Sequence, residues 1–113
     1  MSDKQFNVES IKGTVTIPTS DTVVAGTVTF GSINGVTKNI FFTTPAMTGT
    51  DTPKIQIVNS SGAVFMDSGT VAESVTTVLG TEVAIVEGDK LIATASGTQD
   101  ADASIVYDIR LIR

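Results

Sequence analysis

The stretch that decides the fold is 103–113, ASIVYDIRLIR, in which apolar or aromatic residues recur at every second position. These are Ile105, Tyr107, Ile109 and Leu111, and the positions between them hold Val106, Asp108, Arg110 and Ile112. Because successive side chains of a β-strand point to opposite faces, this alternation predicts a strand with one buried face. The strand is expected to be held in a sheet or an interface, with its mixed face as a rim surface or a subunit contact.

Alternation with a period of two recurs along the whole chain, and no window shows a helical period of apolar residues. Val, Ile and Thr dominate, and Gly, Pro, Asn, Asp and Ser interrupt them at intervals of roughly 8 to 12 residues. Strands are expected at 12–18, 22–30, 36–42, 74–79, 82–86, 91–96 and 103–113. The segment 53–67, PKIQIVNSSGAVFMD, is expected to form a hairpin, in which Ile55 and Ile57 alternate on the first strand, Asn59 to Gly62 form the turn, and residues 63–67 return. About eight or nine short antiparallel strands predict an all-β, jelly-roll-like β-sandwich.

The pattern of the first strand is interrupted at one place. Val15 and Ile17 share one face of the first strand. In an unbroken strand the even-numbered Phe6 and Val8 would point to the opposite face, so a bulge is expected near residues 9–10. Such a bulge would bring both pairs of side chains onto one face of the sheet.

The strand at 36–42 is expected to present Val36, Ile40 and Phe42 on one face. The polar loop that follows, 43–52, is expected to expose Met47. Either this loop or the N-terminal arm could contact a partner.

The length of 113 residues fits one domain, spanning 1–113, with residues 1–10 as a candidate flexible arm. Without cysteine, the fold must be stabilised by packing and by hydrogen bonds between strands. The sequence has no apolar run of about 18 residues and no pattern of a signal peptide. Neither membrane association nor secretion is expected, and synthesis and assembly are expected in a cytoplasm.

Charge composition argues against a nucleic-acid partner. The net charge is −5, and the seven basic residues are spread thinly rather than clustered. Charged residues make up only 17% of the chain, below the ~25% of an average soluble domain. Part of the surface is therefore expected to be neutral, rich in Thr and Ser, and to lie against neighbouring chains.

The residue types that usually perform catalysis are scarce. Histidine, cysteine and tryptophan are absent, which excludes Ser-His-Asp and Cys-His mechanisms and leaves any zinc site to carboxylates alone. The acidic residues in or beside predicted turns are Asp67, Glu73, Glu82, Glu87, Asp89, Asp100 and Asp102. We expect no enzymatic activity, no catalytic residue and no cofactor.

Two features leave alternatives open. In GTQDADAS, 97–104, Asp100 and Asp102 could supply oxygen ligands to calcium, or they could be loop residues that bond their own backbone. Tyr107 could offer a stacking surface to a sugar, although its position beside Ile105 and Ile109 indicates a core residue.

Two stretches carry family resemblances. The segment VAIVEGDKLIATASGTQDADASIVYDIRLIR, with Gly88, Asp89 and Leu91, resembles the C-terminal part of trimeric jelly rolls of the tumour-necrosis-factor type. The stretch AGTVTF…FFTTPAMTGTDTPKIQIVNSSGAVF, together with that ending, is similar to the small β-sandwich decoration (cement) proteins of tailed bacteriophages.

The second resemblance implies a non-enzymatic virion structural protein, assembled in the host cytoplasm. Its expected partners are the lattice of the major capsid protein and further copies of itself, as a homotrimer. The alternative is an adhesion or glycan-binding module of a tail fibre or spike. Neither family supplies catalytic residues to carry over.

Overall fold

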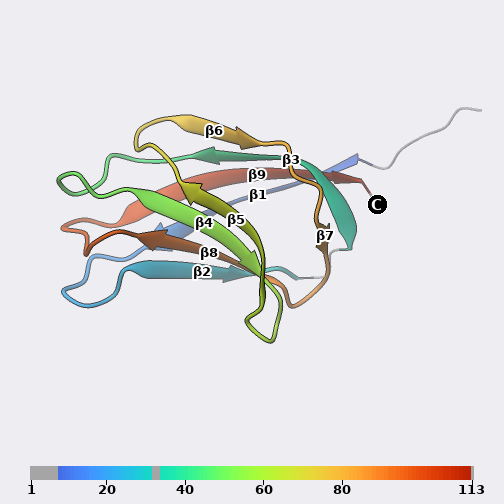
Figure 1. Cartoon of the computed structure of the whole chain (residues 1–113), viewed down its shortest axis with the longest axis horizontal. Coiled ribbons are helices and arrows are strands. Elements are labelled where there is room, and N and C mark those ends of the chain that lie inside the picture. The colour runs from blue at the N-terminus through green and yellow to red at the C-terminus, as the bar shows by residue number, and fades with distance from the viewer. Residues whose placement is uncertain (1–7, 32–33, 113) are drawn as a thin grey trace, which may run out of the picture.

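The computed structural model describes residues 8–31 and 34–112 as two antiparallel sheets packed face to face (Figure 1). Its strands are β1 (Val8–Ile17), β2 (Ala25–Thr29), β3 (Gly35–Thr43), β4 (Pro53–Val58), β5 (Val64–Thr70), β6 (Thr76–Leu79), β7 (Ala84–Ile85), β8 (Lys90–Ala95) and β9 (Ala103–Ile112). No helix occurs within these two ranges. The predicted all-β sandwich is confirmed.

The order of the strands is that of a jelly roll. One sheet has the order β1-β9-β3-β6, with β7 also paired to β3, and the other has the order β2-β8-β4-β5. β6 pairs with residues 40–43 of β3 and β7 pairs with residues 35–36, so β6 and β7 are two parts of one interrupted edge strand. Counted in this way, the first, eighth, third and sixth strands form one sheet, and the second, seventh, fourth and fifth form the other.

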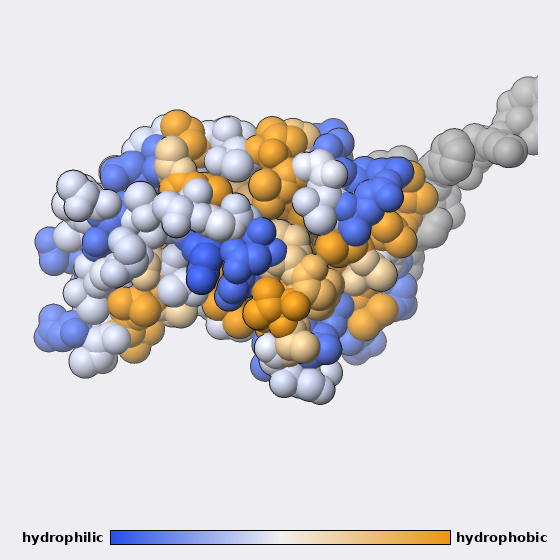
Figure 2. Space-filling view, in the orientation of Figure 1, coloured by the Kyte–Doolittle hydropathy of each residue, from blue (hydrophilic) through white to orange (hydrophobic). Residues whose placement is uncertain are grey.

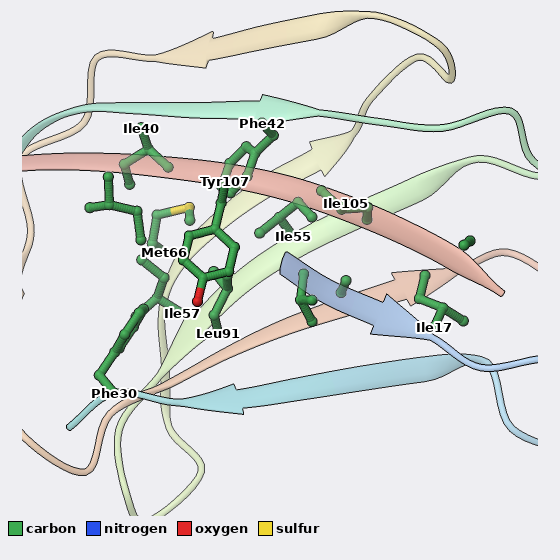
Figure 3. Packing of buried hydrophobic residues seen from close by; sticks show 14 of the residues in the cluster. Ile17, Phe30, Ile40, Phe42, Ile55, Ile57, Met66, Leu91, Ile105 and Tyr107 are labelled. Carbon is green, nitrogen blue, oxygen red and sulfur yellow. The ribbon is translucent and has the colours of Figure 1, made fainter. Parts of the chain in front are cut away.

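The core fills the space between the sheets, where side chains of both inner faces pack together (Figure 3). The predicted inner face of β9 is confirmed, because Ile105, Tyr107, Ile109 and Leu111 are all buried. From the other strands the core receives Val15, Ile17, Ile40, Phe42, Ile55, Ile57 and Leu91, among others. Full burial of each such aliphatic side chain contributes about 1.5–3 kcal/mol relative to exposure, which makes this layer the main source of stability.

The prediction for Val36 is wrong because the register of β3 shifts between Thr37 and Asn39. The shift adds one residue to β3, so positions before it point to the opposite face from the one that the alternation predicts. Val36 is therefore 43% exposed and Thr37 is fully buried. The Thr37 hydroxyl donates to the carbonyl of Thr81 (2.5 Å) and accepts from the backbone N–H of Val83 (2.9 Å). A buried threonine thus supplies hydrogen-bond partners to backbone groups where the edge strand is interrupted between β6 and β7.

The bulge predicted near residues 9–10 is absent. β1 pairs with β9 in an unbroken register from Val8–Ile112 to Ile17–Ala103. An extra residue in β1 would have broken this ladder, because both strands contribute ten consecutive residues to it. Phe6 and residues 1–7 of the candidate arm lie outside the described residues, and residues 8–10 belong to β1.

Met47 is buried, at 7% exposure, which contradicts the predicted exposure of this side chain. It belongs to the core cluster, and its backbone N–H donates to the Glu73 carboxylate (3.1 Å). The loop after β3 therefore contributes an apolar side chain to the core instead of only connecting two strands.

The predicted hairpin between β4 and β5 is confirmed. The backbone N–H of Gly62 donates to the carbonyl of Asn59, and Gly62 has a positive φ of 90°. The Asn59 side-chain oxygen accepts from the backbone N–H groups of Ser61 and Ala63. The asparagine thus performs the turn role that its residue type predicts.

The sheets approach each other most closely where β1 meets β2. A Cβ atom placed on Gly26 would lie 1.9 Å from the carbonyl oxygen of Thr16, so no side chain fits there without moving backbone. Gly26 is therefore needed for close approach of two strands, one from each sheet.

Replacing Gly26 with alanine is expected to lower the free energy of unfolding by roughly 1–3 kcal/mol or more, because the added methyl must displace the β1 backbone. Gly31→Ala is the matched control, since a Cβ at Gly31 would meet nothing within 4 Å. Urea unfolding of both variants measures the difference, and equal stabilities would show that the corner of the sandwich is not tightly packed.

Candidate interaction surface

Asp100 and Asp102, the two aspartates that suggested a calcium site, form hydrogen bonds with different residues. The Asp102 carboxylate accepts from the backbone N–H (2.8 Å) and the hydroxyl (3.0 Å) of Thr19. These bonds, the backbone one first, lower the pKa of Asp102 below its usual value. Asp100 instead bonds through its backbone N–H to the Thr48 hydroxyl (2.9 Å). Both residues act as loop connectors.

Three of the other acidic candidates are each engaged by a nearby donor. Glu82 pairs with Lys38 (2.6 Å), and Asp89, which is buried, accepts from the backbone N–H of Val86. Asp67 accepts from the backbone N–H of Gly69 and from the side chain of Gln56, and these two bonds lower its pKa. Within 8–31 and 34–112, no three acidic side chains lie close enough together to hold a metal ion.

A buried glutamine, which the sequence did not single out, organises this end of the molecule. Gln99 is 2% exposed, and its side-chain oxygen accepts from the backbone N–H of Thr48 (2.8 Å). Its amide nitrogen donates to the Asp51 carboxylate and to the carbonyl of Gly97, both at 3.0 Å. Gln99 therefore ties the loop after β3 to the loop before β9. A glutamine in a polar loop carries no sequence signal of this role.

Tyr107 is a core residue, as its neighbours in the sequence indicate. Its side chain points from β9 into the space between the sheets (Figure 3), and burial raises its pKa above the usual value. A Cβ on Gly13 would lie 2.5 Å from the Tyr107 hydroxyl, so the ring end lies over the glycine of β1. The ring is not accessible for stacking against a sugar.

The outer face of the β1-β9-β3-β6 sheet carries the mixed stripe that the alternation of β9 predicted. Adjacent strands place residues side by side in two rows on this surface, which we call the outer face. The rows are Lys12, Asp108, Phe41 and Val78, and Thr14, Val106, Thr43 and Thr76. Val106 and Val78 are each 52% exposed, which makes them two of the most exposed large apolar side chains among the described residues.

Two charged pairs lie on and beside the outer face. Arg110 lies over the ring of Phe41, 5.3 Å from its centroid, and approaches the Asp108 carboxylate at 3.3 Å. The Lys38–Glu82 pair lies at the bulge beside it. The remaining oxygen of Asp108, Oδ1, is buried and accepts no hydrogen bond from a described residue.

Comparison with known proteins identifies no relative: no protein-family model matches the chain, and no curated protein matches its sequence. In the part of the chain that the structure describes, no helix is long and apolar enough to cross a membrane.

The Asp102–Thr19 contact is expected to make stability depend on pH. Because the folded-state pKa is lowered, the contact stabilises the fold above the unfolded pKa of about 3.9 and loses this effect as pH falls through the folded value. Urea unfolding should show Asp102→Asn to be less stable than the parent at neutral pH, with the difference shrinking in acid. Asp100→Asn is the control, because Asp100 uses its backbone for the Thr48 bond. A difference that persists unchanged below the folded pKa would contradict this account.

Calcium is expected to leave the melting temperature unchanged, because the Asp100 and Asp102 carboxylates are not joined by further acidic ligands among the described residues. Thermal unfolding in EDTA and in about 10 mM calcium, above the range of weak protein sites, tests this. A reproducible rise in melting temperature with calcium, absent in Asp102→Asn, would restore the calcium alternative.

Proposed function

We propose that this protein is a non-enzymatic structural component of a virion that decorates a bacteriophage capsid and associates into trimers. The observation that carries the proposal is the outer face, a broad sheet surface with exposed apolar and hydroxyl-bearing side chains, on which Arg110 pairs with Asp108 and beside which Lys38 pairs with Glu82. The resemblance to decoration proteins supplies the capsid lattice as the partner.

The composition of the outer face supports a contact with protein. Interface cores are depleted of unpaired charge and enriched in aromatic residues and arginine, and here Phe41 and Arg110 stack beside Val78 and Val106. Arg110 and Asp108 form an ion pair, so neither of these two charges would be left without a partner when another protein covers them. Jelly rolls occur in capsid and lectin domains, which supports the proposal only by analogy of fold.

A trimer is consistent with a face of this kind. In a cyclic trimer each subunit places one surface against a different surface of the next, and the ring closes after three copies. The sandwich has two sheets, each with an outward side, so the outer face can contact a neighbouring subunit while the rest of the molecule contacts the capsid.

Val106→Glu is expected to weaken trimer formation at least about tenfold, equivalent to ~1.4 kcal/mol, because it puts an unpaired charge in the middle of the outer face. Capsid binding should weaken as well, because a monomer loses the parallel contacts that a trimer makes with the shell. Val64→Glu is the matched control, since Val64 is 51% exposed and lies on β5 of the other sheet. Light scattering measures the oligomeric state, and electron microscopy measures binding to phage capsids that lack this protein.

Wild-type protein and Val64→Glu should be trimeric and produce ordered density on the shell. A monomeric wild-type protein that produces no such density would refute the proposal. Equal binding by both variants would show that another surface makes the contact.

A further inference from the structure

β5 and β8 end, and β4 begins, at the same end of the other sheet (Figure 1). A small hollow lies at this end, on the outer side of the sheet. Its volume is about 180 Å³, and it is lined by Thr52, Lys54, Thr70, Thr94, Ala95 and Ser96. Pockets for drug-sized ligands have volumes of roughly 300–1,000 Å³, so this one suits a single small chemical group.

Strand pairing explains why hydroxyl groups surround the lysine. Lys54 of β4 lies opposite Thr70 of β5 on one side and opposite Thr94 of β8 on the other. Thr52 precedes β4, and its backbone N–H donates to the Ser96 hydroxyl (3.0 Å), which holds the end of the hollow together. Lys54 therefore lies between threonines of two neighbouring strands and lines the hollow with them.

These donors are not used within the described part of the chain. The hydroxyls of Thr52, Thr70 and Thr94 form no hydrogen bond to another described residue, and no described carboxylate lies within ion-pair distance of the Lys54 ammonium. The hollow thus offers one positive charge and three hydroxyl donors.

Two acidic residues that neighbour residues of the hollow, Asp67 and Asp51, are engaged by neutral donors. Asp67, whose pKa Lys54 helps to lower through space, accepts from Gln56 Nε2 and from the backbone N–H of Gly69, both at 2.8 Å. Figure 2 shows the hydrophilic surface over the middle of β4 and β5, where the Gln56–Asp67 pair lies. Asp51 accepts from the Ser96 hydroxyl and from Gln99 Nε2. Lys54 therefore keeps its ammonium available for a ligand.

We propose that this hollow binds one small oxyanion group, a carboxylate, either free or carried by an acidic sugar. A single ammonium balances the single charge of a carboxylate, and flanking hydroxyls can donate to its two oxygens. With a net charge of −5, the chain provides no long-range attraction for anions, so binding depends on these local donors. The expected dissociation constant is on the order of 1 mM. This inference does not rest on the proposed function, because it concerns the other sheet.

Titration of the isotope-labelled full chain with sodium acetate, sodium glucuronate and glucose, followed by NMR at constant ionic strength, tests the proposal. Acetate and glucuronate should produce saturable shifts in the amide signals of Thr52, Lys54, Thr70 and Thr94, and glucose should produce none. Tighter binding of glucuronate than of acetate would identify a sugar-borne carboxylate, and equal binding would identify the free anion.

Lys54→Met should weaken binding at least about tenfold, and Thr94→Val should weaken it while the charge is kept. Lys90→Met is the matched control, because Lys90 lies on β8 opposite Val58, away from the hollow. Shifts that do not saturate, that persist in Lys54→Met, or that disappear equally in Lys90→Met would overturn the proposal.

Discussion

Strand β9 is hydrogen-bonded along both edges, to β1 and to β3, and its inner face is buried at every second residue. Both requirements apply to the same ten residues, so a slip of one position would expose Ile105, Tyr107, Ile109 and Leu111 together. β9 thereby aligns β1, β3 and the core beneath them. The outer positions of the same strand, Val106, Asp108 and Arg110, are placed on the surface by the same alternation, so the geometry of the proposed interface depends on the packing of the core.

Polar side chains complete the fold where regular pairing ends. The Thr37 hydroxyl bonds the backbone between β6 and β7, Gln99 joins two loops, and Asp102 holds Thr19. The acidic residues in the turns are used in the same way, as acceptors for nearby backbone or side-chain donors. This explains why a chain with many acidic residues in turns brings so few of them together.

The two sheets present different chemistry to the solvent. The outer face of the β1-β9-β3-β6 sheet combines exposed valines and threonines with an arginine stacked on Phe41. The other sheet has Lys54 between threonines, with its acidic neighbours engaged elsewhere. A sheet surface of exposed valines and threonines suits a protein partner and a small polar hollow suits a small anion, so the two proposals concern separate parts of the molecule.

The sequence by itself determined the fold class, the positions of most strands, the β4–β5 turn and the inner face of β9. These follow from alternation and from turn residues, which act locally. Only the tertiary structure decided that Val36 faces outward, that Met47 enters the core, that Gln99 is buried and that Lys54 lies between threonines of two strands. Each of these depends on which distant segments become neighbours. The sequence carries no periodic signal for a register shift, for a loop that contributes to the core, or for a row of side chains across three strands.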